Sequence, residues 1–469
     1  MTSTPAHPSV DERVAAGKEA RRSVPRSSLK GWQPAANRPD PVAVLEEQDA
    51  SRDQDLVPLR HGRMMVSPFT FYRGGAKIMS EDLRHLPRAG FSVQLCGDAH
   101  LSNFGFFGSA ERTMLFDLND FDETLPGPFE YDVARLSASF AVAARNNSFS
   151  PADVAKVARR SVASYRSAMA DFAAMNELEV WYSRLDAETL LAKAFASAGK
   201  KQRASADRGK RVMRKARTKN SLQALNKLTE IVDGTPQIVS APPVVVRGED
   251  FAAAQGLSFE EVDQFVHGLL RSYRESLRAD RRQLLERFEY LEFARKVVGV
   301  GSVGTRAWIV LLRGRGNSSP LFLQVKEATT SVLEDHLPAS VYEQPGERVV
   351  QGQRLMQASG DIFLGWTEGV ETGRYYYWRQ LRDMKGSALI ERQSPKDMAF
   401  YAGACGWTLA RAHARSGDPV AISAYLGRKD SFDRAMTDFA LRYADQNQRD
   451  YDDFIEAIRS GRIEAAETA

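Results

Sequence analysis

The sequence predicts an α+β protein with a mostly helical part and a smaller β-rich part. From Tyr131 to about residue 198, apolar residues recur at three- and four-residue spacing, which is typical of amphipathic helices. Between about residues 290 and 385, short β-branched and aromatic runs are separated by glycine-containing turns, which favours an antiparallel sheet. One helix, at about 346–358, interrupts these runs, and further helices are expected at 397–414 and 431–459.

The composition is that of a soluble globular protein. The chain has 469 residues, of which 43% are hydrophobic and 26% charged, and its net charge is +4. This near balance of charge makes nucleic acid an unlikely partner. Two cysteines are too few for a disulfide framework, and no segment has the length of a membrane span or the apolar core of a signal peptide. We therefore expect a cytoplasmic protein without a membrane partner.

Four segments follow from these patterns. Residues 1–55 are rich in Pro, Ser, Arg and Asp and predict a flexible N-terminal arm. Residues 56–290 are expected to form most of the helical part, 291–385 the β-rich part, and 386–469 helices that complete the helical part. Residues 232–250 predict loops and turns. The basic stretch 200–219 is either a solvated helix face or a site for an anionic partner.

The first chemical motif is CGDAHLSNFGFF, residues 96–107, which follows a strand candidate at 91–95. Loops that follow strands often hold polar catalytic groups. In phosphotransferases, a loop Asp orients the attacking hydroxyl group and an Asn a few residues later binds the metal. Asp98 and Asn103 have this arrangement, with His100 between them.

The second motif is FDLNDFDE, which places Asp117, Asp120 and Asp122 at the end of a strand candidate at 113–118. Clustered carboxylates repel one another unless a cation neutralises them. Oxygen ligands with few histidines favour Mg²⁺. A turn that is merely rich in Asp and Asn is the alternative interpretation.

The third motif is G-x-G-x-x-G, formed by Gly299, Gly301 and Gly304, with Ser302 inside it. Alone this is a weak signal. A strand-like run, TRAWIVLL, follows it, which suits a loop that covers nucleotide phosphates as in kinases. Lys326, near the end of the next apolar run, is then a candidate to contact those phosphates.

A helix with an acidic residue should follow Lys326 and hold it. GERVVQGQRLMQAS offers Glu347, with Glu343 and Glu334 as alternatives. An acid at this position also stabilises the beginning of a helix through the helix dipole, so Glu347 has a second explanation.

These motifs resemble a known family. GDAHLSNFG is similar to the H-G-D-x-H-x-x-N catalytic loop of aminoglycoside and choline phosphotransferases, with Cys96 in place of the first His. The segment after it resembles their I-D-F-x-D-A…Y-D-L-A segment, which implies that Asp120 binds metal and that Asp132 is structural. More closely, RGxxxxM, CGDAHLSNFG and NDFDE resemble a bacterial family of unknown function (domain of unknown function 2252), associated with the protein-kinase-like superfamily.

The order of the motifs differs from that of ordinary kinases. Here the catalytic loop and metal-binding Asp come first, and the Gly loop, Lys, Glu helix and hinge (380–385) come last. The resemblance therefore implies a circularly permuted, protein-kinase-like two-lobe fold, because cutting the usual order before the catalytic loop gives this one. A second, unrelated β domain would give the same order. His413, in the helix that should precede the catalytic loop, is expected to be a partly buried helix residue.

The resemblance implies an ATP- and Mg²⁺-dependent phosphotransferase whose acceptor is a small molecule with a hydroxyl group. The residues that it implies are Asp98 as the catalytic residue, His100 as support for the loop, Asn103 and Asp120 as metal ligands with Asp122 or Asp117 assisting, and Gly299, Gly301, Ser302, Gly304, Lys326 and Glu347 as nucleotide contacts. Arg73 is a candidate for contact with an anion, or for an ion pair with the core.

Three alternatives remain. A related enzyme would transfer AMP in place of phosphate. A metal-dependent phosphohydrolase would need several histidine ligands, but the chain has seven His and only His100 lies in the motifs. A non-catalytic binding module would use the basic stretch 200–219 as its contact surface.

Overall fold

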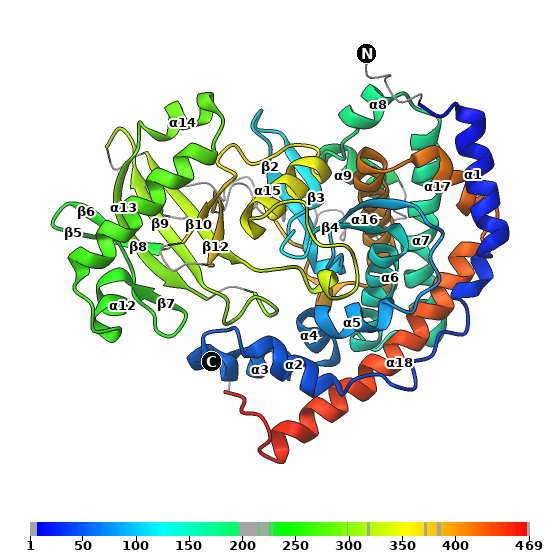
Figure 1. Cartoon of the computed structure of the whole chain (residues 1–469), viewed down its shortest axis with the longest axis horizontal. Coiled ribbons are helices and arrows are strands. Elements are labelled where there is room, and N and C mark those ends of the chain that lie inside the picture. Colours follow the sequence, from blue (N-terminus) through cyan, green and yellow to red (C-terminus); the bar gives the residue numbers. More distant parts are fainter. Residues whose placement is uncertain are drawn as a thin grey trace.

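The structure is a computed structural model that describes residues 7–196, 214, 225–226, 228–297, 299–316, 319–369, 373–381 and 386–466. It is a mixed α+β protein, as the sequence predicts. A helical part and a β-rich part lie side by side, and the helices between residues 41 and 83 lie beneath them in the view of Figure 1. Of the basic stretch 200–219, only residue 214 lies within the described residues.

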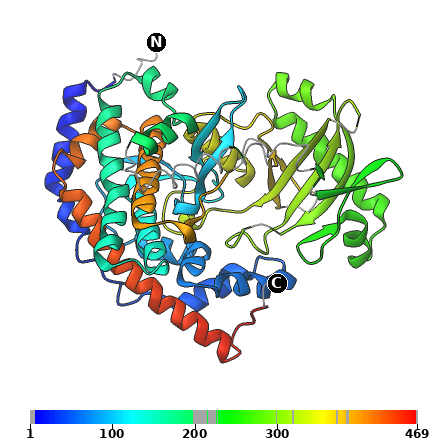
Figure 2. The same ribbon diagram turned by 180° about the vertical axis from the view of Figure 1, so that it is seen from behind.

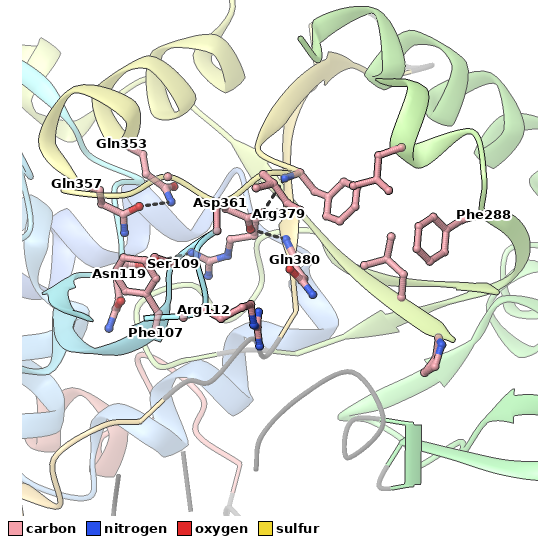
Figure 3. Close-up of a pocket in the computed structure, with 18 of the residues that line it drawn as sticks. Phe107, Ser109, Arg112, Asn119, Phe288, Gln353, Gln357, Asp361, Arg379 and Gln380 are labelled. Carbon is pink, nitrogen blue, oxygen red and sulfur yellow. Dashed lines mark hydrogen bonds between the residues drawn. The ribbon is translucent and has the colours of Figure 1, made fainter. Parts of the chain in front are cut away.

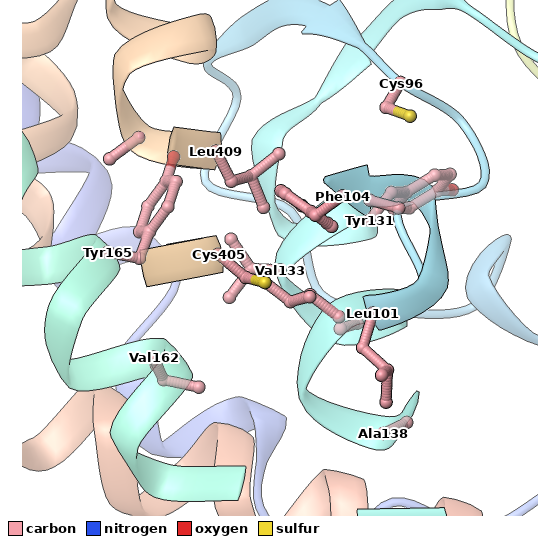
Figure 4. Packing of buried hydrophobic residues seen from close by; sticks show 14 of the residues in the cluster. Cys96, Leu101, Phe104, Tyr131, Val133, Ala138, Val162, Tyr165, Cys405 and Leu409 are labelled. Carbon is pink, nitrogen blue, oxygen red and sulfur yellow. The ribbon is translucent and has the colours of Figure 1, made fainter. Parts of the chain in front are cut away.

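The helical part combines segments from both ends of the chain. Its central helix, α6 (Phe129–Asn146), packs against α7 (Pro151–Ala173), α16 (Pro395–Ser416) and α18 (Ser431–Arg459). Smaller helices complete it, namely α8 (Glu177–Tyr182), α9 (Ala187–Ala196) and α17 (Pro419–Leu426). Figure 4 shows how Cys405 and Leu409 of α16 pack beside Leu101, Phe104 and Tyr165 in one continuous core. Residues about 300 positions apart therefore bury the same apolar surface.

Two short antiparallel pairs of strands lie at the edge of the helical part that faces the sheet. β1 (Ser92–Leu95) pairs with β4 (Leu125–Pro128), and β2 (Phe104–Gly108) pairs with β3 (Met114–Leu118). The loops that connect these four strands carry the first two motifs. Both strand predictions in this region, at 91–95 and 113–118, are confirmed to within a residue.

The β-rich part is one six-stranded antiparallel sheet in the order β11-β12-β10-β9-β8-β7. A long helix, α13, covers one face, where Tyr273 stacks on Trp378 with ring centroids 4.5 Å apart. A second helix, α15, packs against β11, β12 and β10. The elements are β7 (Val245–Arg247), α12 (Gly248–Ala254), α13 (Phe259–Ser276), α14 (Ala279–Leu285), β8 (Glu289–Lys296), β9 (Ala307–Arg313), β10 (Pro320–Ala328), α15 (Pro345–Met356), β11 (Gly365–Glu368) and β12 (Tyr375–Gln380).

The sheet part begins earlier than expected. The segment 232–250, predicted to be loops and turns, contains strands β6 (Thr235–Ile238) and β7, and β6 pairs with β5 (Thr229–Val232) just before it in a separate hairpin. Because β7 pairs with β8 and α13 covers the sheet, residues 245–290 belong with the β-rich part and not with the helical part. The strands are short and flanked by Gly and Pro, which is why their pattern is that of turns. Of the expected hinge, residues 382–385 lie outside the described residues.

The N-terminal segment also differs from the expected flexible arm. Within residues 1–55 it forms α1 (Val10–Ser23) and α2 (Pro41–Asp49), and α3 (Val57–Met64), α4 (Pro68–Gly74) and α5 (Ala76–Leu83) follow directly. Figure 2 shows α1 along the outer side of the helical part. Arg38 anchors the segment because its guanidinium contacts Asp82 and Asp450, each at 2.7 Å. These paired charges are nearly buried, and composition alone does not reveal such long-range pairs. No helix in the described ranges is long and apolar enough to cross a membrane.

Candidate functional site

A cavity of about 320 Å³ lies where the N-terminal helices, the helical part and the sheet meet. Its walls come from segments far apart in the sequence, and they include Arg73, Asp98, Asn103, Asp120, Asp122, Gly301 and Ser302. All three motifs therefore contribute to one cavity. This joint placement is the central observation about the site.

The loop after β1 has a fixed backbone. Gly97 has a φ of +84°, and a Cβ at this position would lie 2.1 Å from the carbonyl oxygen of Glu123, so no other residue fits. Asp132, in the first turn of α6, accepts hydrogen bonds from the backbone nitrogens of Cys96 (2.6 Å) and Gly97 (3.0 Å). His413 Nε2 lies 3.1 Å from the same carboxylate. Asp132 and His413 thus support the loop from within the core.

Asp98 projects from this loop into the cavity. Its carboxylate accepts a 2.8 Å hydrogen bond from Nε of Arg135, a buried residue of α6. Burial alone would lower the pKa of Arg135, but Asp98 and then Tyr72 raise it above its ordinary value. Asn103 Nδ2 donates to the backbone oxygen of Asp98 at 2.7 Å, which leaves the Asn103 side-chain oxygen as a possible ligand atom. Asp98 is therefore held in one orientation.

His100 lies beneath the loop and is 4% exposed. Burial lowers the pKa of His100 to about 3, so the imidazole is neutral at physiological pH. Its Nδ1 accepts a hydrogen bond from the backbone nitrogen of Ser102 at 3.2 Å. Nε2 lies 3.7 Å from the Asp98 carboxylate, which is beyond hydrogen-bond distance. This geometry suits a residue that shapes the loop.

The segment after β3 brings two carboxylates to one lysine. Lys326, 2% exposed on β10, has its Nζ 2.5 Å from Asp122 and 3.5 Å from Asp120. Tyr377, opposite Lys326 on β12, donates to the other oxygen of Asp122 at 2.6 Å. Burial would lower the pKa of Lys326, but Asp120 and then Asp122 raise it above its ordinary value. Lys326 is therefore a buried cation that contacts the cavity through Asp120 and Asp122 and does not line it itself.

The two carboxylates respond differently to this environment. Burial, and then the charge of Asp122, raise the pKa of Asp120. Burial would also raise the pKa of Asp122, but the contact with Lys326 outweighs it and the pKa is lowered. Asp120 Oδ1 has no hydrogen-bond partner among the described residues. This oxygen faces Lys326 Nζ at 3.5 Å, so Asp120 is held less tightly than Asp122, which contacts both Lys326 and Tyr377.

This donor set fits Mg²⁺. Asp120 and the Asn103 side-chain oxygen both line the cavity, and Asp122 lies next to them. In the described part of the chain, no three His, Cys, Asp or Glu side chains form a group that could hold a metal ion by themselves. Mg²⁺ is usually held by one or two carboxylates, with substrate phosphates and waters as further ligands, so a smaller protein contribution suits it.

Asp117 lies apart from the cavity. It is 1% exposed and forms an ion pair with Arg411 of α16. Its two oxygens also accept hydrogen bonds from the backbone nitrogens of Leu118 and Ala358, both at 2.9 Å. Of the three acids in the second motif, the structure therefore brings Asp120 and Asp122 to the site and places Asp117 in the core.

The Gly loop lies between strands β8 and β9. Gly299 and Gly304 have φ values of +70° and +86°, which only glycine adopts readily. The loop is fixed by the N-terminal segment, because Arg52 donates to Val303 O at 2.6 Å and Asp53 N donates to Gly304 O at 2.8 Å. Ser302 Oγ reaches Asp122 at 3.5 Å, so the loop touches the acidic segment directly.

Glu347 does not contact Lys326. It lies in the first turn of α15 and accepts from Gln351 Nε2 at 3.3 Å, whereas Lys326 contacts Asp122 and Asp120. The residue that α15 contributes instead is Arg348, which donates to Thr124 O at 2.5 Å and to Asp122 O at 2.8 Å. Glu334 lies 3.9 Å from Arg348. The helix thus fixes the acidic segment through an arginine, in place of holding the lysine through a glutamate.

Several residues of the site were missed in the sequence. No local sequence pattern identifies Tyr377 or Arg348, because their partners are about 225 to 255 residues away. Arg135 had one: it lies three residues after Asp132 on the same helix, so both face the loop after β1. Arg73 was considered, and it lines the cavity with its Nε unpartnered among the described residues.

Comparison with known proteins adds a family and no activity. A search of the curated proteins and a search of the solved structures found no match. A family model described as "Uncharacterized protein conserved in bacteria (DUF2252)" matches residues 52–457. The match spans Arg52 and Asp53, which fix the Gly loop, together with the three motifs and nearly all of the C-terminal helices. The chain therefore belongs to this bacterial DUF2252 family.

Proposed function

We propose that the protein is an ATP- and Mg²⁺-dependent phosphotransferase that acts on a hydroxyl group of a small molecule. The observation that carries the proposal is the contact of Lys326 with Asp122 and Asp120, beside Asp98 and Asn103. A lysine from a sheet, a metal-binding Asp, and an Asp/Asn loop are the parts that kinases use for phosphoryl transfer. Here they come from segments about 200 residues apart and meet at one cavity.

The element order supports a permuted kinase-like fold. In the sheet part, β8, the Gly loop, β9, β10 with Lys326, α15, β11 and β12 follow one another as in the nucleotide-binding lobe of kinases. The Asp/Asn loop and the acidic segment precede this lobe in sequence, where ordinary kinases place them after it. The helical part is completed by α16 to α18, which follow the sheet.

Each residue then has a role. The backbone at Gly299–Gly304 would cover the phosphates, and Lys326, which pairs with Asp120 and Asp122, would contact them. Asn103 and Asp120 hold Mg²⁺, which neutralises charge on the phosphates when bound. Asp98 orients the acceptor hydroxyl and receives its proton, while Arg135 fixes its carboxylate.

The test is calorimetric titration of ATP with and without Mg²⁺. We expect Mg²⁺-dependent binding that Lys326→Ala and Asp120→Ala each weaken at least tenfold. Lys156→Ala, an exposed lysine of α7, is the matched control and should bind as wild type does. No ATP binding by folded wild-type protein would overturn the proposal.

A second experiment separates catalysis from binding. Asp98→Ala should abolish turnover of ATP with an accepted substrate, yet keep nucleotide affinity within a few-fold of wild type, because Asp98 faces the acceptor. Analysis of the nucleotide product distinguishes the alternative of AMP transfer: ADP supports phosphate transfer, and release of pyrophosphate contradicts it. Full activity of Asp98→Ala would remove this residue from the mechanism.

A further inference from the structure

One arginine in the wall of the candidate site is left without a partner. Arg73, in the last turn of α4, lines the cavity together with Asp98 and Gly301. The sequence is compatible with two roles for it, contact with an anion or an ion pair with the core. Its side chain forms no hydrogen bond and no ion pair with any residue that the structure describes. Contact with an anion is therefore the role that remains.

The outer end of the Arg73 guanidinium is the part that a ligand can reach. Nε is buried, so nothing in the cavity contacts it. Nη1 and Nη2 also have no partner among the described residues, but neither is buried as Nε is. Because Arg73 lines the cavity, these two nitrogens are open to a ligand there. They carry most of the N–H donors of the guanidinium.

The other basic side chains of this cavity are engaged. Arg52 donates to the backbone of the Gly loop at 2.6 Å, and its Nε lies 3.3 Å from Asp49. Lys77 Nζ lies 2.8 Å from Glu47. Of the basic side chains that line the cavity and that the structure describes, only Arg73 is without a partner.

A second cavity, between the helical part and the sheet, shows the usual arrangement. Arg379 lies in its wall (Figure 3) and donates to Gln324 Oε1 at 2.9 Å and to Asn119 O at 3.1 Å. Charged groups that are partly withdrawn from water are normally paired or hydrogen-bonded. Arg73 departs from this rule, and burial lowers its pKa more than the charge of Asp98 raises it. Such a group at a cavity is typical of a binding site.

The position of Arg73 is fixed from two sides. A Cβ at Gly301, the middle glycine of the Gly loop, would lie 3.1 Å from the carbonyl oxygen of Arg73, so α4 and the loop are in contact. The carbonyl oxygen of the preceding residue, Tyr72, accepts from Arg135 Nη2 at 2.8 Å, and Arg135 also holds Asp98. Arg73 thus lies between the loop proposed to cover the phosphates and the residue proposed to orient the acceptor. The phosphoryl group that a phosphotransferase transfers occupies this place.

We propose that Arg73 binds the terminal phosphate of ATP, the group that is transferred, an inference that rests on the proposed phosphotransferase function. The planar guanidinium presents paired N–H donors that match phosphate oxygens. In the reaction, the bond from the terminal phosphorus to the bridging oxygen breaks, and ADP leaves with the bonding electrons. The acceptor oxygen bonds to that phosphorus and gives its proton to Asp98. Arg73 stabilises the negative charge on the other oxygens of the transferred group.

The test compares Mg²⁺–ATP with Mg²⁺–ADP by calorimetric titration of the full chain, because only ATP carries the terminal phosphate. We expect Arg73→Ala to weaken binding of Mg²⁺–ATP by about tenfold or more, and binding of Mg²⁺–ADP by less than about twofold. Arg73→Lys keeps the charge but not the paired donors, so its loss of ATP affinity should be smaller than that of Arg73→Ala. A purely structural role of Arg73 would not separate the two nucleotides.

Lys77→Ala is the matched control, because it removes a positive charge that Glu47 already pairs from the same cavity wall. It should keep both affinities within about twofold of wild type, and thermal melts show that each variant is folded. Equal weakening of both nucleotides by Arg73→Ala, or unchanged affinity for Mg²⁺–ATP, would overturn this inference and leave the phosphotransferase proposal standing. No binding of Mg²⁺–ATP by folded wild-type protein would overturn both.

Discussion

Four aspartates between residues 117 and 132 lie in two contrasting environments. Asp117 and Asp132 belong to the core, each 1% exposed, and each accepts two backbone N–H groups and contacts one basic side chain, Arg411 or His413. Asp120 and Asp122 face the cavity, are 32% and 29% exposed, and share Lys326. One short segment therefore uses aspartates in two ways, two to stabilise the core and two to line the cavity.

In the core, the protein satisfies each carboxylate fully. Buried charges persist in proteins when they are paired and hydrogen-bonded, so these two aspartates are best explained by structure. At the cavity, Asp120 Oδ1 has no hydrogen-bond partner among the described residues, and burial, followed by the charge of Asp122, raises the pKa of Asp120. An incompletely satisfied carboxylate beside a like charge is typical of a ligand-binding site.

The largest expected effect is on stability and separates the two environments. Asp117→Ala leaves Arg411 as a buried cation and should lower the free energy of unfolding by about 3–5 kcal/mol. Asp120→Asn removes repulsion between two carboxylates and should change it by less than about 1 kcal/mol. Urea unfolding followed by circular dichroism measures both. A comparable loss of stability in Asp120→Asn would contradict the contrast.

The residues and loops of this site could be predicted from the sequence better than the contacts between them. Asp98, Asn103, Asp120, Lys326 and the Gly loop were recognised because each lies in a short local pattern, at the end of a strand or between strands. Local patterns depend on neighbours in sequence, so they are readable from it. That these pieces meet at one cavity could be expected only from the resemblance to kinases.

The partners of these residues could not be predicted, because each depends on a contact across the fold. Glu347 was expected beside Lys326 from its position in a helix, yet α15 turns Arg348 and not Glu347 toward the acidic segment. Residues 1–55 were expected to be flexible from composition, yet Arg38 and Arg52 make hydrogen bonds with residues more than 40 positions away. Such pairs have no periodic signal.

A third buried carboxylate, Glu130, predicts a pH dependence of stability. It is fully buried, with one hydrogen bond from Ala89 N and no partner for Oε2 among the described residues, and burial raises its pKa to about 7. A raised carboxyl pKa means that the folded state binds more protons than the unfolded state between pH 4.5 and 7. Stability therefore falls as pH rises through this window, by on the order of 3 kcal/mol for this group.

Glu130→Gln tests this slope. The variant cannot ionise at residue 130, so its free energy of unfolding should fall less than that of wild type between pH 4.5 and 7. The difference in free energy of unfolding between the two proteins should therefore change with pH. Urea unfolding at half-unit pH steps measures it. A constant difference between Glu130→Gln and wild type over this range would contradict the raised pKa.

A smaller effect is expected at Asp120 when its neighbour loses its charge. In Asp122→Asn, the repulsion disappears and Lys326 is left with Asp120 as its partner. Both changes favour ionised Asp120, so its pKa should fall. Carbon-detected NMR of aspartate carboxyl groups, assigned with Asp120→Asn, follows the titration directly. A pKa that stays the same or rises would contradict the electrostatic coupling between the two carboxylates.

The smallest effect concerns the contact between the Gly loop and the acidic segment. Ser302 Oγ lies 3.5 Å from Asp122 Oδ2, at the limit of hydrogen-bond distance, whereas Lys326 and Tyr377 contact the same carboxylate at 2.5 and 2.6 Å. A long hydrogen bond beside two short ones adds little, so Ser302→Ala should weaken Mg²⁺–ATP binding by less than about threefold. A loss as large as that of Lys326→Ala, measured by the same calorimetric titration, would mean that the hydroxyl contacts the nucleotide itself. The Gly loop would then contribute a side chain, and not only its backbone, to the site.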